Sequence, residues 1–161
     1  MALPRLDLDP HRPTRHLPDL LRAALEDGQR AARRQAPGGA PLNLRDQAFL
    51  RRVDAVVDRH FADCGFGTAH LAERLGLSER HLRRRVSALT GETPGVRLRR
   101  RRIEVGVALL GTGAYTVARV AAAVGYGGAE GFRRAFVSLR GHQPSQVFRG
   151  GVPPNEAPTN A

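Results

Sequence analysis

Apolar side chains recur every three or four residues through the middle of the chain, which is the spacing of one face of an α-helix. The first such stripe falls at i, i+4, i+7, i+8 and i+12 and consists of Phe49, Val53, Val56, Val57 and Phe61. No stretch keeps the strict alternation of a β-strand long enough to compete with this helical pattern. The pattern therefore predicts an all-α fold.

Capping residues divide the helical pattern into separate elements. Thr68 is expected to cap the second helix of this region, and Ser78 the one that follows. Thr93-Pro94 then opens a long helix, because proline is favoured in the first turn. This helix is predicted to run to about Leu110 and to end at Gly111.

The strongest pattern is an internal repeat. Leu71-Ala72-x-x-Leu75-Gly76-Leu77 returns 49 residues later as Val120-Ala121-x-x-Val124-Gly125-Tyr126. The apolar stripe that follows it, Leu82, Val86 and Leu89, returns 50 residues later as Phe132, Phe136 and Leu139. A short helix, a turn with glycine and a second amphipathic helix form a helix-turn-helix pattern. This pattern occurs twice in the chain.

Small residues have direct structural roles in the repeat. Ala72 and Ala121 allow the first helix of each unit to lie close to the second. Gly76 and Gly125 are expected in the turns, because glycine adopts positive φ without a steric penalty. Only 5% of the residues are aromatic and none is Trp, so the core is expected to consist of Leu, Val and Ala.

The charge of the chain indicates a polyanionic partner. The formal net charge is +11, and all 26 basic residues are arginine. A composition bias toward arginine explains part of this number, but 18 arginines and only 9 acids fall within 46–149, where the repeat lies. The guanidinium group binds two acceptors at once, which suits phosphate and guanine.

Each second helix of the repeat presents arginines on its outward face. The first unit places Arg80, Arg83, Arg84 and Ser87 there, and the second places Ala129, Glu130, Arg133 and Arg134. One amphipathic helix with such a face is often only a solvated surface. The same arginine pair in both repeats favours contact with DNA.

Asp46–Arg149 resembles the DNA-binding domain of the arabinose-regulator (AraC/XylS) family, and it is similar to the output domain of hybrid two-component regulators. The likeness rests on the repeat, on Thr90-Gly91-x-x-Pro94, and on Phe132-Arg133-Arg134-Ala135-Phe136 followed by Gly141-x-x-Pro144-Ser145. It implies two helix-turn-helix subdomains joined by a long central helix, about seven helices in all. Each recognition helix would enter a major groove on one face of the DNA.

The resemblance also implies roles for individual residues. The base-reading candidates are Arg80, Arg83, Arg84, Glu130, Arg133 and Arg134. The candidates for contact with the DNA backbone are Thr68, Ser78, Ser87, Arg99, Arg100 and Thr116. Glu130 would accept from a cytosine amino group or orient Arg134, and the orienting role is preferred. Arg102 matches a structural position, for which an acidic partner is expected, and the other arginines of its helix are interpreted as a solvated or phosphate-facing surface.

Several residues depart from the family pattern. Gly106 replaces a usual alanine, the turn Gly127-Gly128-Ala129 offers no Ser or Asp cap, and Gly131 lies within the second recognition helix. A glycine in a helix interior costs about 1 kcal/mol relative to alanine. The second unit is therefore expected to be softer than the first.

The expected domain organisation has three parts. Residues 1–45 form an arm with a short connector helix over Leu17–Arg34 and a Pro/Gly linker. Residues 46–149 form the DNA-binding domain, with the first helix-turn-helix at about 68–90, the linker helix at about 94–110 and the second helix-turn-helix at about 116–140. Residues 150–161 are expected to be a disordered tail.

These patterns predict a sequence-specific transcription regulator, an activator, rather than an enzyme. No catalytic motif occurs, and Cys64, His70 and His81 lack zinc-finger spacing, so neither a metal nor a cofactor is expected. The expected partners are double-stranded DNA and RNA polymerase. No membrane partner is expected, and the location is the cytoplasm, at the nucleoid, as a monomer or weak dimer. The alternative is a protein-interaction or nonspecific DNA-binding module derived from a truncated hybrid two-component regulator.

Overall fold

The computed structural model describes residues 42–147, which form six α-helices and one short 3-10 helix without a strand. The elements are α2 (Leu44–His60), α3 (Thr68–Arg74), α4 (Glu79–Thr90), α5 (Pro94–Gly111), α6 (Val117–Ala123), α7 (Ala129–Arg140) and η1 (Pro144–Val147). The all-α prediction is confirmed. The connector helix, the linker and the tail expected from the sequence lie outside the described residues. No helix within 42–147 is long and apolar enough to cross a membrane.

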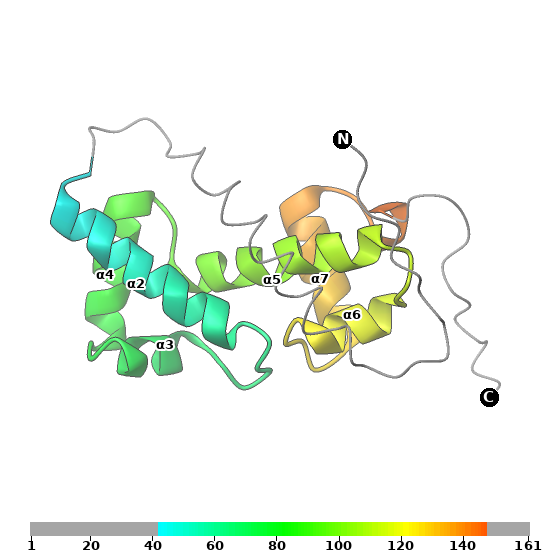
Figure 1. Ribbon diagram of the computed structural model, residues 1–161, viewed down its shortest axis with the longest axis horizontal. Coiled ribbons are helices and arrows are strands. Elements are labelled where there is room, and N and C mark those ends of the chain that lie inside the picture. The colour runs from blue at the N-terminus through cyan, green and yellow to red at the C-terminus, as the bar shows by residue number, and fades with distance from the viewer. Residues whose placement is uncertain (1–41, 148–161) are drawn as a thin grey trace.

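The helices form two units at the two ends of α5, which belongs to both (Figure 1). The first unit consists of α2, α3 and α4 packed on the beginning of α5. The second consists of α6, α7 and η1 packed on its end. The 18 residues of α5 span about 27 Å at 1.5 Å per residue.

Side-chain caps fix the start of most helices. The hydroxyl of Ser78 accepts from the backbone N–H of His81 at 3.3 Å, as the sequence predicts. The expectation that Thr68 caps α3 is wrong, because Gly67 is the N-cap and Thr68 is the first helical residue. The long helix also ends later than expected. Its C-cap is Thr112, so Gly111 is its last residue rather than its end signal.

The core is one continuous cluster that runs through both units. Contrary to the expectation of a Leu, Val and Ala core, phenylalanines lie at its centre. Phe132 and Phe136 of α7 are fully buried, and their ring centroids lie 5.6 Å apart. Gly106 of α5 allows this packing, because a Cβ there would lie 2.8 Å from the ring of Phe132.

Two ion pairs join α2 to α5 inside the first unit. Arg97 donates to both carboxylate oxygens of Asp54, at 2.5 and 2.8 Å, and this hydrogen bonding raises the pKa of Arg97. One turn further along, Arg101 donates to Asp58 at 2.7 Å, and the Arg101 side chain is only 8% exposed. The expectation that the arginines of α5 form a solvated or phosphate-facing surface is therefore wrong for these two, because they hold α2 in place.

Candidate nucleic-acid interface

The two units have the same local geometry at their turns. In the first, the N–H of Leu77 donates to the carbonyl of Ala72 at 2.9 Å, and Gly76 has a φ of +69°. In the second, the N–H of Tyr126 donates to the carbonyl of Ala121, also at 2.9 Å, and Gly125 has a φ of +82°. Ala72 and Ala121 are buried as predicted. The sequence repeat is thus a structural repeat.

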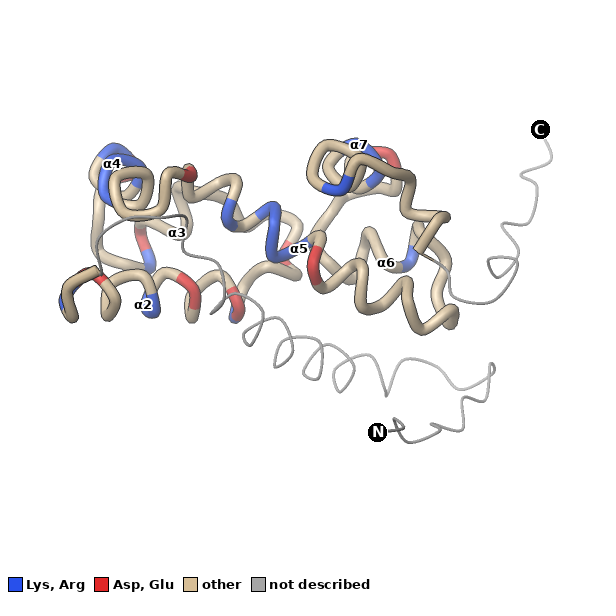
Figure 2. Tube along the Cα trace, turned by 90° about the horizontal axis from the view of Figure 1, so that it is seen from above, with Lys and Arg blue, Asp and Glu red and all other residues tan. Residues whose placement is uncertain are grey.

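The second helices of the two units, α4 and α7, lie on the same side of the molecule, one at each end of α5 (Figure 2). Helix α2 lies on the other side. The burial of the Leu82 and Val86 stripe in α4 and of Phe132 and Phe136 in α7 orients both helices. The polar face of each helix therefore points away from α5.

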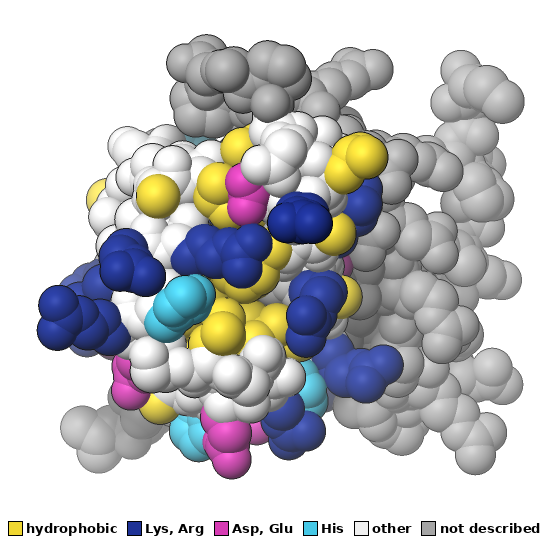
Figure 3. Space-filling model, turned by 90° about the vertical axis from the view of Figure 1, so that its left-hand side faces the viewer, with side chains coloured by type: hydrophobic (Ala, Val, Ile, Leu, Met, Phe, Trp, Pro, Cys, Tyr) yellow, Lys and Arg dark blue, Asp and Glu magenta, His cyan; other side chains and the backbone are white. Residues whose placement is uncertain are grey.

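The outward face of α4 carries three arginines. Arg80, Arg83 and Arg84 are all exposed, and none of them forms an ion pair within the described part of the chain. The end of the molecule formed by α2 and α4 carries many arginines and few acids (Figure 3). A surface of this kind offers several guanidinium groups, each of which can donate two parallel hydrogen bonds to an anionic ligand.

The outward face of α7 is mixed. Glu130 and Arg134 are exposed, and Arg133 is half-buried. The preferred role of Glu130 was to orient Arg134, but no ion pair joins the two among the described residues. The N-cap of α7 is Gly128, which provides no side-chain cap, in agreement with the sequence interpretation.

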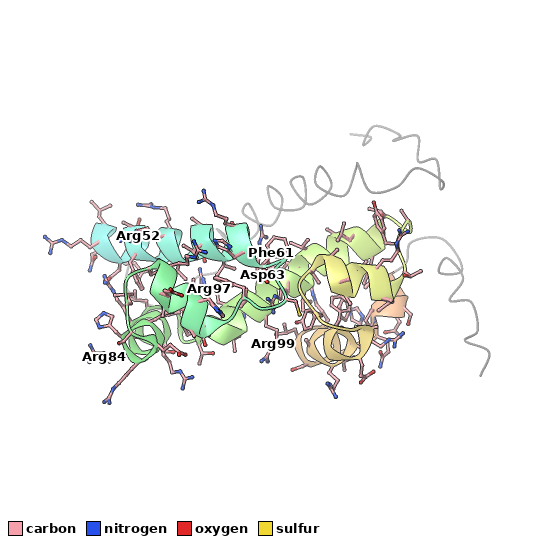
Figure 4. The ribbon with its side chains drawn as sticks, turned by 90° about the horizontal axis from the view of Figure 1, so that it is seen from below. Arg52, Phe61, Asp63, Arg84, Arg97 and Arg99 are labelled. Carbon is pink, nitrogen blue, oxygen red and sulfur yellow. The ribbon has the colours of Figure 1, made fainter. Side chains whose placement is uncertain are left out.

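Most residues predicted to contact a DNA backbone already have a partner within the protein. The four hydroxyls form local hydrogen bonds: Thr68 with Glu79, Ser78 with the N–H of His81, Ser87 with the carbonyl of Glu92, and Thr116 with the N–H of Arg119. Arg100 pairs with Glu92. Arg99 is exposed and forms no ion pair among the described residues, and its side chain lies between α4 and α7 on their side of the molecule (Figure 4).

Within residues 42–147 Arg102 forms no ion pair with an acid, so the acidic partner expected there is wrong. Its Nε donates to the carbonyl of Phe61 at 2.8 Å, and an Nη donates to the carbonyls of Asp63 at 2.7 Å and Phe66 at 3.1 Å. Burial lowers its pKa. The guanidinium also lies 5.7 Å from the centre of the Tyr126 ring. Arg102 thus connects the loop after α2 to the second unit.

The sequence analysis missed the acids that hold α5. Asp54 and Asp58 stand four residues apart on α2, and Arg97 and Arg101 stand four residues apart on α5. Residues at i and i+4 share one face of a helix. The equal spacing of two acids on one helix and two arginines on another was the sequence signal that could have predicted these ion pairs.

Known proteins share this arrangement. The profile described as a helix-turn-helix domain matches residues 71–150. The C-terminal domain of AraT, a response regulator from Geobacillus stearothermophilus, is 26% identical with a TM-score of 0.58, over 61% of this chain and 81% of that one. No curated protein sequence matches the chain.

Two further solved structures are similar in fold. The C-terminal domain of the two-component response regulator yesN from Fusobacterium nucleatum has a TM-score of 0.60 at 22% identity, over 63% of this chain and 99% of that one. A DNA-binding transcriptional dual regulator from Escherichia coli K-12 has a TM-score of 0.54 at 20% identity, over 68% and 93%. At these identities the likeness shows the fold alone.

Proposed function

We propose that this protein is a sequence-specific transcription regulator of the AraC type that reads DNA with α4 and α7, since residues 71–150 match the model of a helix-turn-helix domain. The observation that carries the proposal is the placement of two arginine-bearing helices on one side of the molecule, at the two ends of α5 (Figure 2). Successive major grooves on one face of B-DNA lie about 34 Å apart. Helix α5, which carries one recognition helix toward each end, is about 27 Å long, a length of the same order.

The arginines of α4 supply the first set of base contacts. Arg80, Arg83 and Arg84 lie at i, i+3 and i+4 on the exposed face, so their side chains project toward the same groove. Arginine bidentate to guanine is the most common specific contact, and each contact contributes about 1–3 kcal/mol of discrimination between bases. Because no ion pair with another described residue holds these side chains, they are available to a ligand.

In the second unit, Arg133 and Arg134 occupy the positions equivalent to Arg83 and Arg84. Glu130 is exposed beside them and is a carboxylate acceptor. Because the described ion pairs do not include Glu130 with Arg134, we assign it to acceptance from a cytosine amino group. The second unit therefore reads a different set of bases from the first.

Phosphate contacts come from groups between and beside the recognition helices. Arg99 projects from α5 on the side of α4 and α7, where the DNA backbone would cross between the two grooves (Figure 4). Such a contact raises affinity without adding sequence information. The N–H groups at the starts of α3 and α6, next to Thr68 and Thr116, are further donors.

We also propose activation of transcription through RNA polymerase, by a monomer or weak dimer located in the cytoplasm at the nucleoid. Arg52 of α2 points to the side away from α4 and α7 and so stays accessible when DNA is bound (Figure 4). The exposed side chain of Arg52 supports a contact with a second protein.

Selection of binding sites from random duplex DNA tests the proposal. We expect two enriched half-sites about 10 bp apart at about 0.15 M salt. Arg83→Ala should weaken the base preference in one half-site and Arg133→Ala that in the other. Arg52→Ala, on the opposite face, should change neither. Enrichment of no sequence, with strong binding at low salt, would refute the specific regulator and support the protein-interaction or nonspecific DNA-binding alternative.

A further inference from the structure

The two units touch each other directly, in addition to sharing α5. The loop between α2 and α3 in the first unit faces the turn between α6 and α7 in the second (Figure 1). At Gly125, an added Cβ would lie 2.4 Å from the carbonyl oxygen of Phe61 and 3.1 Å from the carbonyl carbon of Ala62. At Gly127, it would lie 3.5 Å from the sulfur of Cys64. We call this contact between 61–66 and 125–127 the inter-unit joint.

Arg102 lies at the centre of the inter-unit joint. It projects from the middle of α5 and donates to three carbonyls of the loop, those of Phe61, Asp63 and Phe66. Its guanidinium also lies over the ring of Tyr126 in the turn of the second unit. Phe61 and Asp63 lie where the two units meet (Figure 4). One side chain therefore holds both sides of the joint.

The two repeats differ at this point in an informative way. Gly76 and Gly125 occupy the same position of the repeat and both have positive φ. A Cβ on Gly76 would have no atom within 4 Å, whereas a Cβ on Gly125 would collide with the backbone of the loop. The turn of the first unit thus needs glycine only for its φ, and the turn of the second also needs it for close approach to the first unit.

We infer that the inter-unit joint fixes the relative position of α4 and α7, with Arg102 as the positioning residue, and so determines which half-site spacing the protein accepts. The inference rests on the proposed reading of DNA by both helices. Long helices are rarely straight and bend gently along their length. The joint braces the two units on one side of α5, which restricts this bending and holds the two recognition helices in one register.

The test uses the two half-sites found by selection, placed at the selected spacing and at spacings one base pair shorter and longer. One base pair moves the second half-site by about 3.4 Å and turns it by roughly 34°. We expect the wild-type chain to lose about tenfold in affinity at each altered spacing, comparable to one mismatched base pair. Arg102→Met and Gly125→Ala should reduce this loss to about threefold or less, because the units can then shift relative to each other.

Two matched variants separate positioning from general stability. Gly76→Ala introduces the same backbone strain as Gly125→Ala without touching the joint. Arg97→Met removes an arginine of α5 that holds α2 rather than the loop. Both should lower the melting temperature and keep the wild-type spacing preference. Affinity for a single isolated half-site should be equal in Arg102→Met and wild type, which shows that each unit is still folded.

The inference is overturned if Arg102→Met and Gly125→Ala retain the tenfold spacing preference, or if the wild-type chain tolerates all three spacings equally. In both cases the selected half-sites remain, so the proposed function stands. If no half-site is enriched at all, the proposed function fails before spacing is measured. The two failures are thus distinguishable.

Discussion

The two ion pairs between α2 and α5 both join an aspartate to an arginine but differ in burial. We therefore expect removal of the aspartate to lower the free energy of unfolding by different amounts. Arg101–Asp58 is the buried pair, with side-chain exposures of 8% and 20%. Arg97–Asp54 is the more exposed pair, at 24% and 44%. We predict that Asp58→Ala destabilises the protein considerably more than Asp54→Ala.

The magnitudes follow from burial. Removing one partner of a buried pair leaves a charge without compensation, which costs about 3–5 kcal/mol. Arg101 keeps a second acid, Glu104 at 3.5 Å, so we expect about 2–3 kcal/mol for Asp58→Ala. Water screens a partly exposed pair, but the bidentate geometry of Arg97 and Asp54 puts the expected cost of Asp54→Ala at about 1 kcal/mol, the upper end for such pairs.

Urea unfolding of the two single variants measures these costs. The combined change of Asp58→Ala with Arg101→Met should recover most of the loss, since an apolar side chain of similar length fills the buried site without a charge. Equal destabilisation by Asp54→Ala and Asp58→Ala would refute the argument from burial. A double variant as unstable as Asp58→Ala alone would show that the packing of α2, rather than the charge left on Arg101, sets the loss of stability.

Three further predictions concern the recognition helices and the turn of the second unit. Gly131→Ala should stabilise α7 by about 1 kcal/mol, because the new Cβ meets Tyr126 at an ordinary 3.6 Å; a lower melting temperature would contradict this. Ser78→Ala should cost about 1 kcal/mol through loss of the cap on α4, measured by thermal unfolding, and Ser78→Asp should retain the stability. Tyr126→Phe should stabilise by roughly 1 kcal/mol, because the buried hydroxyl of Tyr126 has no hydrogen-bond partner in the described part of the chain. Burial also raises the pKa of Tyr126, so the wild-type chain should lose stability as pH rises above about 10 and the variant should lose less.

The sequence predicts the fold and the faces of the recognition helices well, because both follow from local periodicity. The stripe of Leu82 and Val86 fixes which side of α4 is buried, and the arginines are then exposed by default. The same reasoning from the repeat predicts the positive φ of Gly76 and Gly125. These predictions need only the spacing of residues within one helix or turn.

The sequence does not predict partners that come from distant parts of the chain. Arg102 was expected to pair with an acid, but it binds backbone carbonyls, and carbonyls carry no signature of residue type. Arg97 and Arg101 were expected on a solvated or phosphate-facing surface, and only the position of α2 shows that they are structural. The prediction that Thr68 is the N-cap of α3 was wrong for a local reason. Residue type alone does not distinguish a threonine at the first helical position from one at the N-cap.

The continuity of the core has a consequence for how this protein folds. Helix α5 supplies buried residues to both units, Leu98 to the first and Leu109 to the second, within one apolar cluster. Neither unit can bury its own apolar face without α5, so the two repeats should unfold in a single cooperative transition. A shorter chain that ends before α6 would expose the apolar face of α5 to water. We therefore expect the two repeats to form one folding unit, so that urea unfolding followed in either repeat gives the same transition.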